Sequence, residues 1–112
     1  MTNCLFCKIA AGEIPTDMIA SDDRFVGFRD IAAQAPTHIV VIPRAHVASL
    51  NEVKDQDLIG GLMLFARGIA EQEGLAERGY RVVINTNADG GQTVFHIHAH
   101  VLGGRILGWP PG

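Results

Sequence analysis

Apolar and polar residues alternate with two periodicities along this chain, one typical of helices and one typical of strands. Between residues 55 and 72, four large apolar residues recur at intervals of four, three and four. This spacing places them on one stripe of a long amphipathic helix. The four residues are Leu58, Leu62, Phe65 and Ile69. A second, short helix is predicted for residues 4–11, with Gly12 placed to end it.

Five strands are predicted around the long helix. Residues 38–43 read HIVVIP, a β-branched and nearly all apolar run that is typical of a strand buried on both faces, and Pro43 ends it. We expect this strand near the centre of the sheet. Short turns join most of the strands, so the sheet should be mainly antiparallel with the long helix on one face, an α+β fold. The other strands are expected at residues 18–20, 24–28, 80–85 and 94–102.

Length and composition indicate one folded domain. The 112 residues, 47% apolar and 19% charged, suit a single core spanning residues 1–112. A domain of this size buries roughly two thirds of the surface of its unfolded chain, so pairing with a second copy would hide further apolar area. The single Trp, Trp109, lies in a terminal WPPG segment that cannot continue a strand, and we expect its ring to be buried.

The net charge and the length of the apolar runs argue against two classes of partner. A net charge of −3 does not suit binding to a nucleic-acid backbone. No run reaches the roughly 18 apolar residues of a membrane span, and the first residues do not resemble a signal peptide. We therefore expect no nucleic acid or membrane partner and a cytoplasmic location. In that reducing setting Cys4 and Cys7 stay thiols, and their C-x-x-C spacing is typical of half a metal site or of a redox pair.

Three of the five histidines occupy alternate positions of one predicted strand. Residues 95–102 read FHIHAHVL, and strand side chains alternate between faces, so His96, His98 and His100 should project together. Three imidazoles in a row favour a reactive centre over ordinary core or surface histidines. They could also hold a catalytic zinc ion with an open position.

A glycine-containing segment precedes the histidines. Residues 89–93 read DGGQT, where two glycines allow backbone N–H groups to turn inward and cradle an anion. An oxyanion cradle beside an imidazole nucleophile suits phosphoryl or nucleotidyl transfer. The other interpretation of this segment is an ordinary hairpin loop.

Together these segments resemble the histidine triad (HIT) family, in its Hint branch of nucleotide-binding proteins. The triad motif His-x-His-x-His is present at residues 96–100 and is followed by apolar residues. The resemblance covers nearly the whole chain. It also includes FRDI at 28–31, residues 35–46, YRVVIN at 80–85, DGGQT at 89–93 and the terminal WPPG at 109–112.

The resemblance implies an enzyme that cleaves the P–N bond of purine nucleoside 5′-phosphoramidates and of aminoacyl-adenylate-like compounds. It implies a homodimer whose two five-stranded sheets join into one of ten strands. His98 would attack the α-phosphorus to give a nucleotidyl-histidine, and His96 and His100 complete the triad, with His100 at the phosphoryl oxygens or the leaving group. Purine nucleotides, derivatives of AMP, would be bound by Phe28, Asp30, Ile31, Asn85, Gly91, Gln92, Thr93, His98, His100 and Trp109.

The chemistry of the residues agrees with this division of roles. A neutral imidazole is a competent nucleophile near pH 7, so no cofactor is required for catalysis. We expect His98 to attack and His100, two residues on, to supply the proton that an amine leaving group needs. Thr93 departs from the usual Ser, which keeps the hydroxyl but adds a methyl group. His38 opens a buried strand, and we expect a structural role for it.

A structural zinc site follows from the resemblance as well. In members with an N-terminal C-x-x-C, the two thiolates bind zinc together with two histidines, which here would be His46 and His96. The other interpretation is that Cys4 and Cys7 are small buried apolar groups and that the histidines only form hydrogen bonds.

Three other functions remain open from the sequence. One is hydrolysis of dinucleoside polyphosphates on the same fold, and another is a nucleotide-binding or scaffold protein with little turnover. The third is a hydrolase that uses a catalytic zinc ion.

Overall fold

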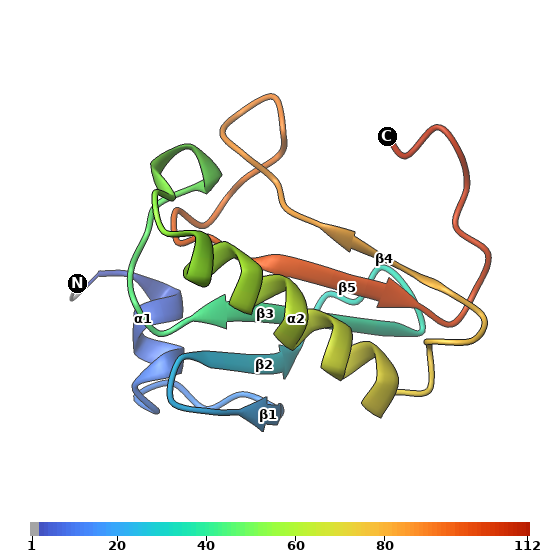
Figure 1. Ribbon diagram of the computed structural model, residues 1–112, viewed down its shortest axis with the longest axis horizontal. Helices are drawn as coiled ribbons and strands as arrows, with labels where there is room; N and C mark the ends of the chain where they lie inside the picture. Colours follow the sequence, from blue (N-terminus) through green and yellow to red (C-terminus); the bar gives the residue numbers. More distant parts are fainter. Residues whose placement is uncertain (1–2) are drawn as a thin grey trace.

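A five-stranded sheet organises residues 3–112, the part of the chain that the computed structural model describes. The strand order is β1-β2-β3-β5-β4, and all neighbouring strands are antiparallel (Figure 1). The strands are Met18–Ser21 (β1), Phe25–Arg29 (β2), Thr37–Pro43 (β3), Tyr80–Val83 (β4) and Ala99–Gly103 (β5). The helices are Leu5–Ala10 (α1), the 3₁₀ turn Leu50–Glu52 (η1) and Gln56–Gln72 (α2). The predicted α+β class and the predicted five strands are confirmed.

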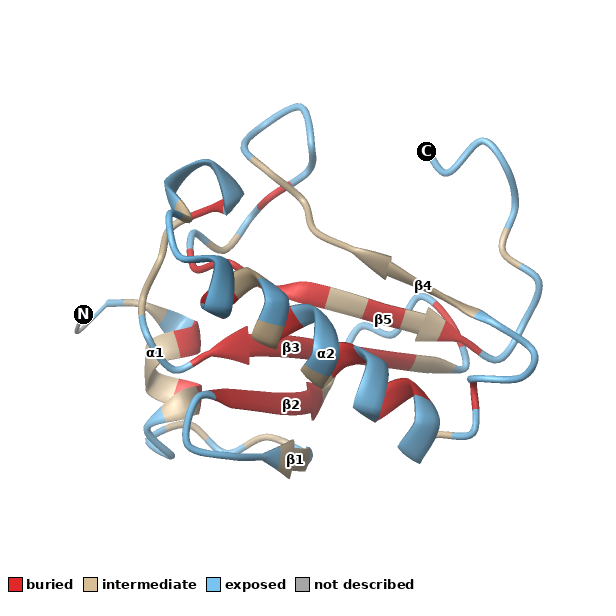
Figure 2. Cartoon of the chain, viewed as in Figure 1, coloured by how far each residue is buried: buried red, intermediate tan, exposed pale blue. Residues whose placement is uncertain are grey.

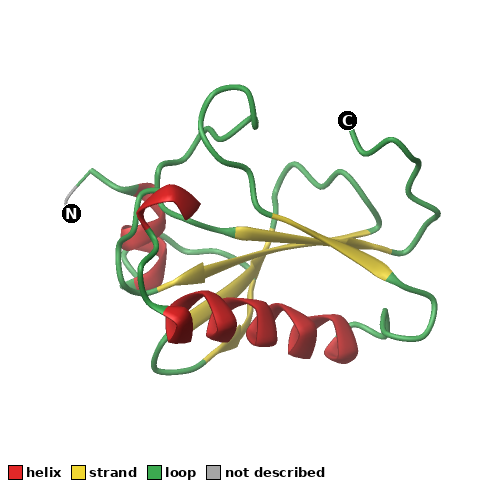
Figure 3. Cartoon of the chain, turned by 45° about the horizontal axis from the view of Figure 1, so that its top comes forward, coloured by secondary structure: helices red, strands yellow, loops and turns green. Residues whose placement is uncertain are grey.

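The long helix α2 covers one face of the sheet (Figure 3). Asp55 caps it, since its carboxylate accepts a hydrogen bond from the backbone N–H of Asp57 at 2.9 Å. Three members of the predicted stripe are buried, and Phe65 is half-buried at its edge. Burial of this stripe against the sheet forms the larger core, with Leu62, Ala66, Ile69, Ile39, Val41, Ala99 and Val101 among its members.

The short helix α1 covers part of the opposite face. Its Phe6 and Ile9 pack on Val26, Phe28, Val40 and Ile42. Consecutive residues of β3 therefore enter different cores, and the whole strand except its first residue is buried (Figure 2). The prediction of a central strand buried on both faces is confirmed.

The strand expected at residues 94–102 is shorter than predicted. β5 begins only at Ala99, and residues 94–98 lie outside the ladder. The continuing register of β3 would place Pro43 opposite Ile97, but proline has no N–H to donate. Instead, the Pro43 carbonyl accepts a hydrogen bond from the ring of His96 at 2.7 Å, and the Ile97 N–H donates to Val47 at 2.7 Å.

Trp109, whose ring we expect to be buried, is not buried within the single chain. Its side chain is 83% exposed, and its ring lies beside the Arg81 guanidinium at 5.9 Å. The terminal segment runs beside the outer edge of β4, where Arg81 also donates to the carbonyls of Leu107 and Gly108. Within residues 3–112, no helix has both the length and the apolar character needed to cross a bilayer.

Candidate active site

The three histidines of the FHIHAHVL segment share one side of the chain, even though only His100 lies in β5. Ile97, Ala99 and Val101 enter the core beneath α2. The imidazoles lie on the opposite side, where the rings of His98 and His100 are 5.0 Å apart. The backbone of residues 94–98 bends at residues 94–96, yet it places His96 and His98 on the side opposite Ile97 without the hydrogen bonds of a strand.

His98 is held in one tautomer. Its Nδ1 lies 2.8 Å from the backbone carbonyl of His96. A carbonyl oxygen only accepts, so Nδ1 carries the hydrogen and Nε2 keeps a lone pair. Burial lowers the pKa of His98, so the ring is neutral at pH 7. A buried, neutral imidazole with a free Nε2 lone pair is suited to nucleophilic attack.

His100 is held in the opposite tautomer through His38. The Gln34 N–H donates to Nδ1 of His38 at 3.0 Å, so the hydrogen of the neutral His38 ring is on Nε2. That Nε2–H lies 2.9 Å from Nδ1 of His100, which must therefore accept. Nε2 of His100 then carries a hydrogen that it can donate to a substrate oxygen.

Both rings of this pair are neutral near pH 7. Burial, together with the charges of His98 and His38, lowers the pKa of His100 to about 4. Burial also lowers the pKa of His38, opposed by the nearby Asp30 carboxylate. We expected His100 to deliver a proton as an acid at pH 7. Because its ring is neutral at this pH, it instead serves as a hydrogen-bond donor.

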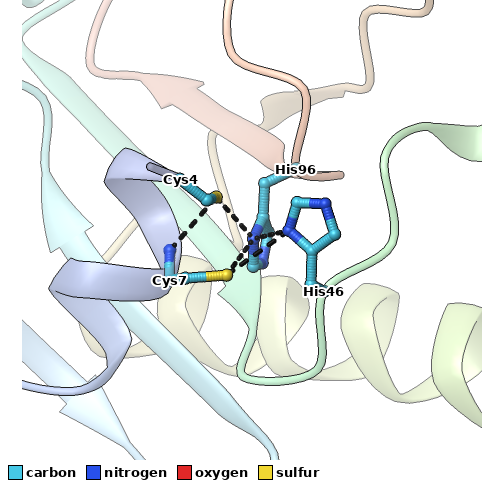
Figure 4. A group of neighbouring side chains, drawn as sticks. All are labelled: Cys4, Cys7, His46 and His96. Atoms are coloured by element: carbon cyan, nitrogen blue, oxygen red, sulfur yellow. Dashed lines mark hydrogen bonds between the residues drawn. The ribbon is translucent and has the colours of Figure 1, made fainter. Parts of the chain in front are cut away.

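The ring of His96 forms a cluster with Cys4, Cys7 and His46 (Figure 4). Its Nδ1 lies 3.3 Å from Sγ of Cys4, 3.4 Å from Sγ of Cys7 and 3.2 Å from Nδ1 of His46. Sγ of Cys7 is 3.3 Å from Nδ1 of His46. Since Nε2 of His96 donates to Pro43, both of its ring nitrogens are engaged within the protein.

The four side chains fit a tetrahedral zinc ion. Zinc–sulfur bonds of about 2.3 Å and zinc–nitrogen bonds of about 2.0–2.1 Å place sulfur and nitrogen ligands about 3.6 Å apart, and two nitrogens about 3.3 Å apart. The four separations given above lie within about 0.3 Å of those values, and all four ligand atoms lie within 4.8 Å of one another. The hydrogen bond to Pro43 directs the lone pair of His96 Nδ1 into the cluster, as an outer partner of a metal ligand does.

The loop that connects β4 to the histidines is closed by its own hydrogen bonds. The N–H groups of Gly91 and Gln92 donate to Ala88 and Asn87, both at 3.0 Å. The predicted amide cradle for a phosphate is therefore wrong for these two groups. Asn85 also serves the loop, because its amide donates to the Gly90 carbonyl at 2.7 Å.

Gln92 fixes this loop to the rest of the site. Its buried side-chain amide donates to the carbonyls of Ala48 at 2.8 Å and Val94 at 3.1 Å, and accepts from the Asn87 N–H at 2.9 Å. The exposed Thr93 follows directly and lines a hollow of about 800 Å³ together with His46 and Phe95. Gln92 therefore positions the segment on which Thr93 is carried.

Comparison with known proteins identifies the family. A family model for the HIT domain matches residues 11–107. This chain belongs to the HIT family. The purine nucleoside phosphoramidase of Escherichia coli strain K12 is 50% identical to this HIT protein over 106 residues, which are 93% of this chain and 89% of the relative.

Solved structures show the same family. A HIT family hydrolase from Legionella pneumophila Philadelphia 1 superposes with a TM-score of 0.95 at 53% identity, covering 98% of this chain and all of the other. A zinc-bound histidine triad family protein from Mycobacterium smegmatis superposes with a TM-score of 0.83 at 34% identity, covering 93% and 76%. The HIT protein is an enzyme of the hydrolase class, as the resemblance predicted.

Of the remaining predicted site residues, Asp30 lies beside the histidines, whereas Trp109 lies beside Arg81 on β4. Phe28 is buried in β2. Asp30 follows this strand and lies 3.4 Å from Nε2 of His38. Ile31 and Trp109 are exposed in the single chain, so neither side chain encloses a nucleotide-binding pocket there.

Sequence reasoning did not find two residues of this site. Phe6 packs edge to face on His98, with ring centroids 4.9 Å apart, and His38 sets the tautomer of His100. Neither role has a local signal, because each depends on contacts between distant segments. The position of Phe6 inside the C-x-x-C segment was the one feature that could have drawn attention to it.

Proposed function

We propose that this HIT protein hydrolyses the P–N bond of purine nucleoside 5′-phosphoramidates and aminoacyl-adenylate-like compounds, with His98 as the nucleophile. One observation carries the assignment: the hydrogen bond from Nδ1 of His98 to the His96 carbonyl leaves Nε2 unprotonated. The name and the 50% identity of the Escherichia coli relative support the substrate class.

The reaction has two displacement steps. In the first, a bond forms between Nε2 of His98 and the α-phosphorus, the P–N bond breaks, and the leaving nitrogen takes up a proton from solvent water and departs as the amine. In the second, the oxygen of a water molecule bonds to the phosphorus, the bond to Nε2 of His98 breaks, and the nucleoside monophosphate leaves. The proton that this water loses returns to solvent, which balances the proton taken up in the first step. Nε2–H of His100 donates a hydrogen bond to a phosphoryl oxygen as charge develops there.

The other site residues bind the ribose, the purine and the phosphate of the substrate. Asp30 takes the ribose hydroxyls, Phe28 and Ile31 bound the purine, and Thr93 offers its hydroxyl to the phosphate. Asn85, Gly91 and Gln92 act by shaping the loop that carries Thr93, as their hydrogen bonds and the positive φ of 81° at Gly91 indicate.

The test is release of a fluorescent amine from an adenosine 5′-phosphoramidate. Wild type should release amine in many turnovers, and His98→Ala should release none while it keeps the folded spectrum. Leu64→Ala, on the exposed side of α2, serves as the matched control and should keep full activity. Retained turnover in His98→Ala contradicts the proposal, whereas cleavage of diadenosine tetraphosphate in preference to the phosphoramidate would favour a dinucleoside polyphosphate hydrolase.

We also propose that Cys4, Cys7, His46 and His96 hold a structural zinc ion. The ion would tie the N-terminal helix to the histidine segment, and it leaves His98 and His100 free for catalysis. The zinc-bound relative from Mycobacterium smegmatis supports this. Protein purified without chelators should contain about one zinc per chain by elemental analysis, and Cys7→Ser should lose it. Wild type free of zinc and of other metals would contradict the assignment.

A homodimer completes the proposal. The outer edge of β4 has no strand partner within residues 3–112, and exposed Ile106 and Trp109 lie on the segment beside it. Pairing of two such edges would give the ten-stranded sheet and cover apolar groups that one chain leaves in water.

A further inference from the structure

We propose that α1 is a positioning element for His98, anchored by the Cys4, Cys7, His46 and His96 cluster and acting through Phe6. The inference rests on the nucleophile and the zinc ligands proposed above. It adds a mechanical link between them, in which the state of the cysteine–histidine cluster sets the orientation of the reactive imidazole.

The first part of the link is the helix itself. α1 has six residues, too few to be stable without outside contacts. Its N-terminal end is formed by Cys4, whose sulfur accepts a hydrogen bond from the Cys7 N–H at 3.3 Å. Both sulfurs face the two histidines of the cluster, as Figure 4 shows. The cluster is therefore the polar anchor that fixes where this helix begins.

The second part is Phe6, which lies between the two cysteines. Its buried ring meets the ring of His98 edge to face, with centroids 4.9 Å apart and planes at 86°. It also contacts the ring of His96 at 6.1 Å and 75°. Any shift of α1 moves an aromatic edge that packs directly on the nucleophile.

The third part is the backbone of residues 94–98. This segment is outside the sheet ladder. The His96 carbonyl fixes Nδ1–H of His98, and the His96 ring is fixed by the cluster and by Pro43. His98 is thus held from two directions, through Phe6 and through His96, and both lead to the same four side chains.

The consequence is a selective effect on turnover. A misplacement of about 1 Å at a reacting atom costs on the order of 10²-fold in rate. Loss of the Phe6 ring should lower kcat by about 10- to 100-fold, while KM changes less than about threefold, because the phosphate contacts lie elsewhere.

The experiment compares Phe6→Leu with Phe25→Leu. Both remove one buried aromatic ring, but Phe25 lies in the core beneath α2 and contacts Phe65. Urea unfolding reports the stability of each variant. We expect a similar loss of stability in both and a fall in kcat only in Phe6→Leu. An equal kcat effect in the two variants, or a change confined to KM, overturns the proposal.

A second readout does not depend on activity. Nitrogen-15 NMR of His98 should show Nδ1–H as the dominant tautomer in zinc-loaded wild type. Removal of zinc by a chelator, or Phe6→Leu, should convert this to a mixture of tautomers, and Zn²⁺ should restore the single form in wild type. An unchanged His98 signal in either sample overturns the proposal. If wild type shows this response but has no phosphoramidase activity, the link stands and the proposed function fails.

Discussion

Nε2 of His38 and Nδ1 of His100 lie 2.9 Å apart across two neighbouring strands, β3 and β5. Because the Gln34 N–H occupies the other nitrogen of His38, this contact has one direction, with His38 donating and His100 accepting. The hydrogen left on Nε2 of His100 is therefore determined by a residue that we place outside contact with substrate.

His38→Phe should lower kcat by about 10²-fold with a small effect on KM, because His100 would lose the partner that fixes its tautomer. Steady-state kinetics with the fluorescent phosphoramidate measures both constants. His38→Gln, whose amide can still donate, should retain more activity than His38→Phe. If nitrogen-15 NMR finds Nε2–H unchanged on His100 in His38→Phe, His38 does not set the tautomer of His100.

Stability should fall in mild acid. Burial lowers the pKa of His100 to about 4, whereas an unfolded imidazole titrates near 6.5. Between these values the unfolded chain binds more protons. The free energy of unfolding is therefore highest above pH 6.5 and decreases as the pH falls toward about 4, by at most about 3 kcal/mol from this group.

Urea unfolding at several pH values should show this slope in wild type and a shallower one in His100→Gln. The difference between the two proteins isolates His100 from groups that titrate in both, including those of the cysteine–histidine cluster. Parallel pH profiles for the two proteins would show that the pKa of His100 is not lowered by folding.

Leu62→Ala should destabilise the protein by about 2–5 kcal/mol, because it leaves a cavity in the fully buried core beneath α2. Leu64→Ala is the matched control on the same helix, where the side chain is 65% exposed, and it should change stability by less than about 0.5 kcal/mol. Urea unfolding midpoints compare the two. Equal effects would mean that α2 is oriented differently.

Gly90→Ala should destabilise the loop before the histidines and lower activity. A Cβ at this position would lie 2.4 Å from the Thr86 carbonyl oxygen, so backbone would have to move, at a cost of about 1–3 kcal/mol. At Gly60, within α2, a Cβ meets nothing within 4 Å, and Gly60→Ala should stabilise by about 0.5–1 kcal/mol. Thermal unfolding with the amine-release assay checks both, and a fully active, equally stable Gly90→Ala would contradict this geometry.

Trp109 reports on the proposed homodimer. The ring is 83% exposed in one chain, and it is the single Trp of the sequence. If a second copy covers it, fluorescence emission should move to longer wavelength when the protein is diluted into its monomeric range. Size-exclusion chromatography over the same concentrations gives the independent measurement. Monomer at every concentration, with red-shifted emission throughout, would contradict the homodimer.

Much of the fold followed from local patterns. The four apolar residues of α2 and the HIVVIP run of β3 each carry a periodicity that sequence alone displays. The start of β5 was missed because the sequence of residues 94–98 continues the alternating pattern, although its backbone bends at 94–96 and Pro43 offers no N–H opposite Ile97. An alternating pattern of apolar and polar residues indicates which side each side chain faces. It does not indicate whether the backbone forms hydrogen bonds with a neighbouring strand.

The site was only partly predictable for the same reason. The triad and the C-x-x-C pair are visible as motifs, and the structure brings Cys4, Cys7, His46 and His96 together. The tautomers of His98 and His100 depend instead on a backbone carbonyl and on His38, which is 62 residues away from His100. The two loop amides expected to bind phosphate were already used by the loop, which no dipeptide pattern reveals.

The two faces of β5 and of the segment before it have different roles, one in the core and one in the site. Ile97, Ala99 and Val101 pack beneath α2, while the alternating histidines face α1 and the site. Substitutions beneath α2 can therefore raise or lower the melting temperature without touching the reacting groups. On the other face, Phe6 both packs in the smaller core and contacts the rings of His96 and His98, so a substitution there affects stability and the site together. Substitutions that adapt this enzyme to temperature should accordingly lie mainly on the α2 face of the sheet. Substitutions that adapt it to other substrates should lie on the α1 face.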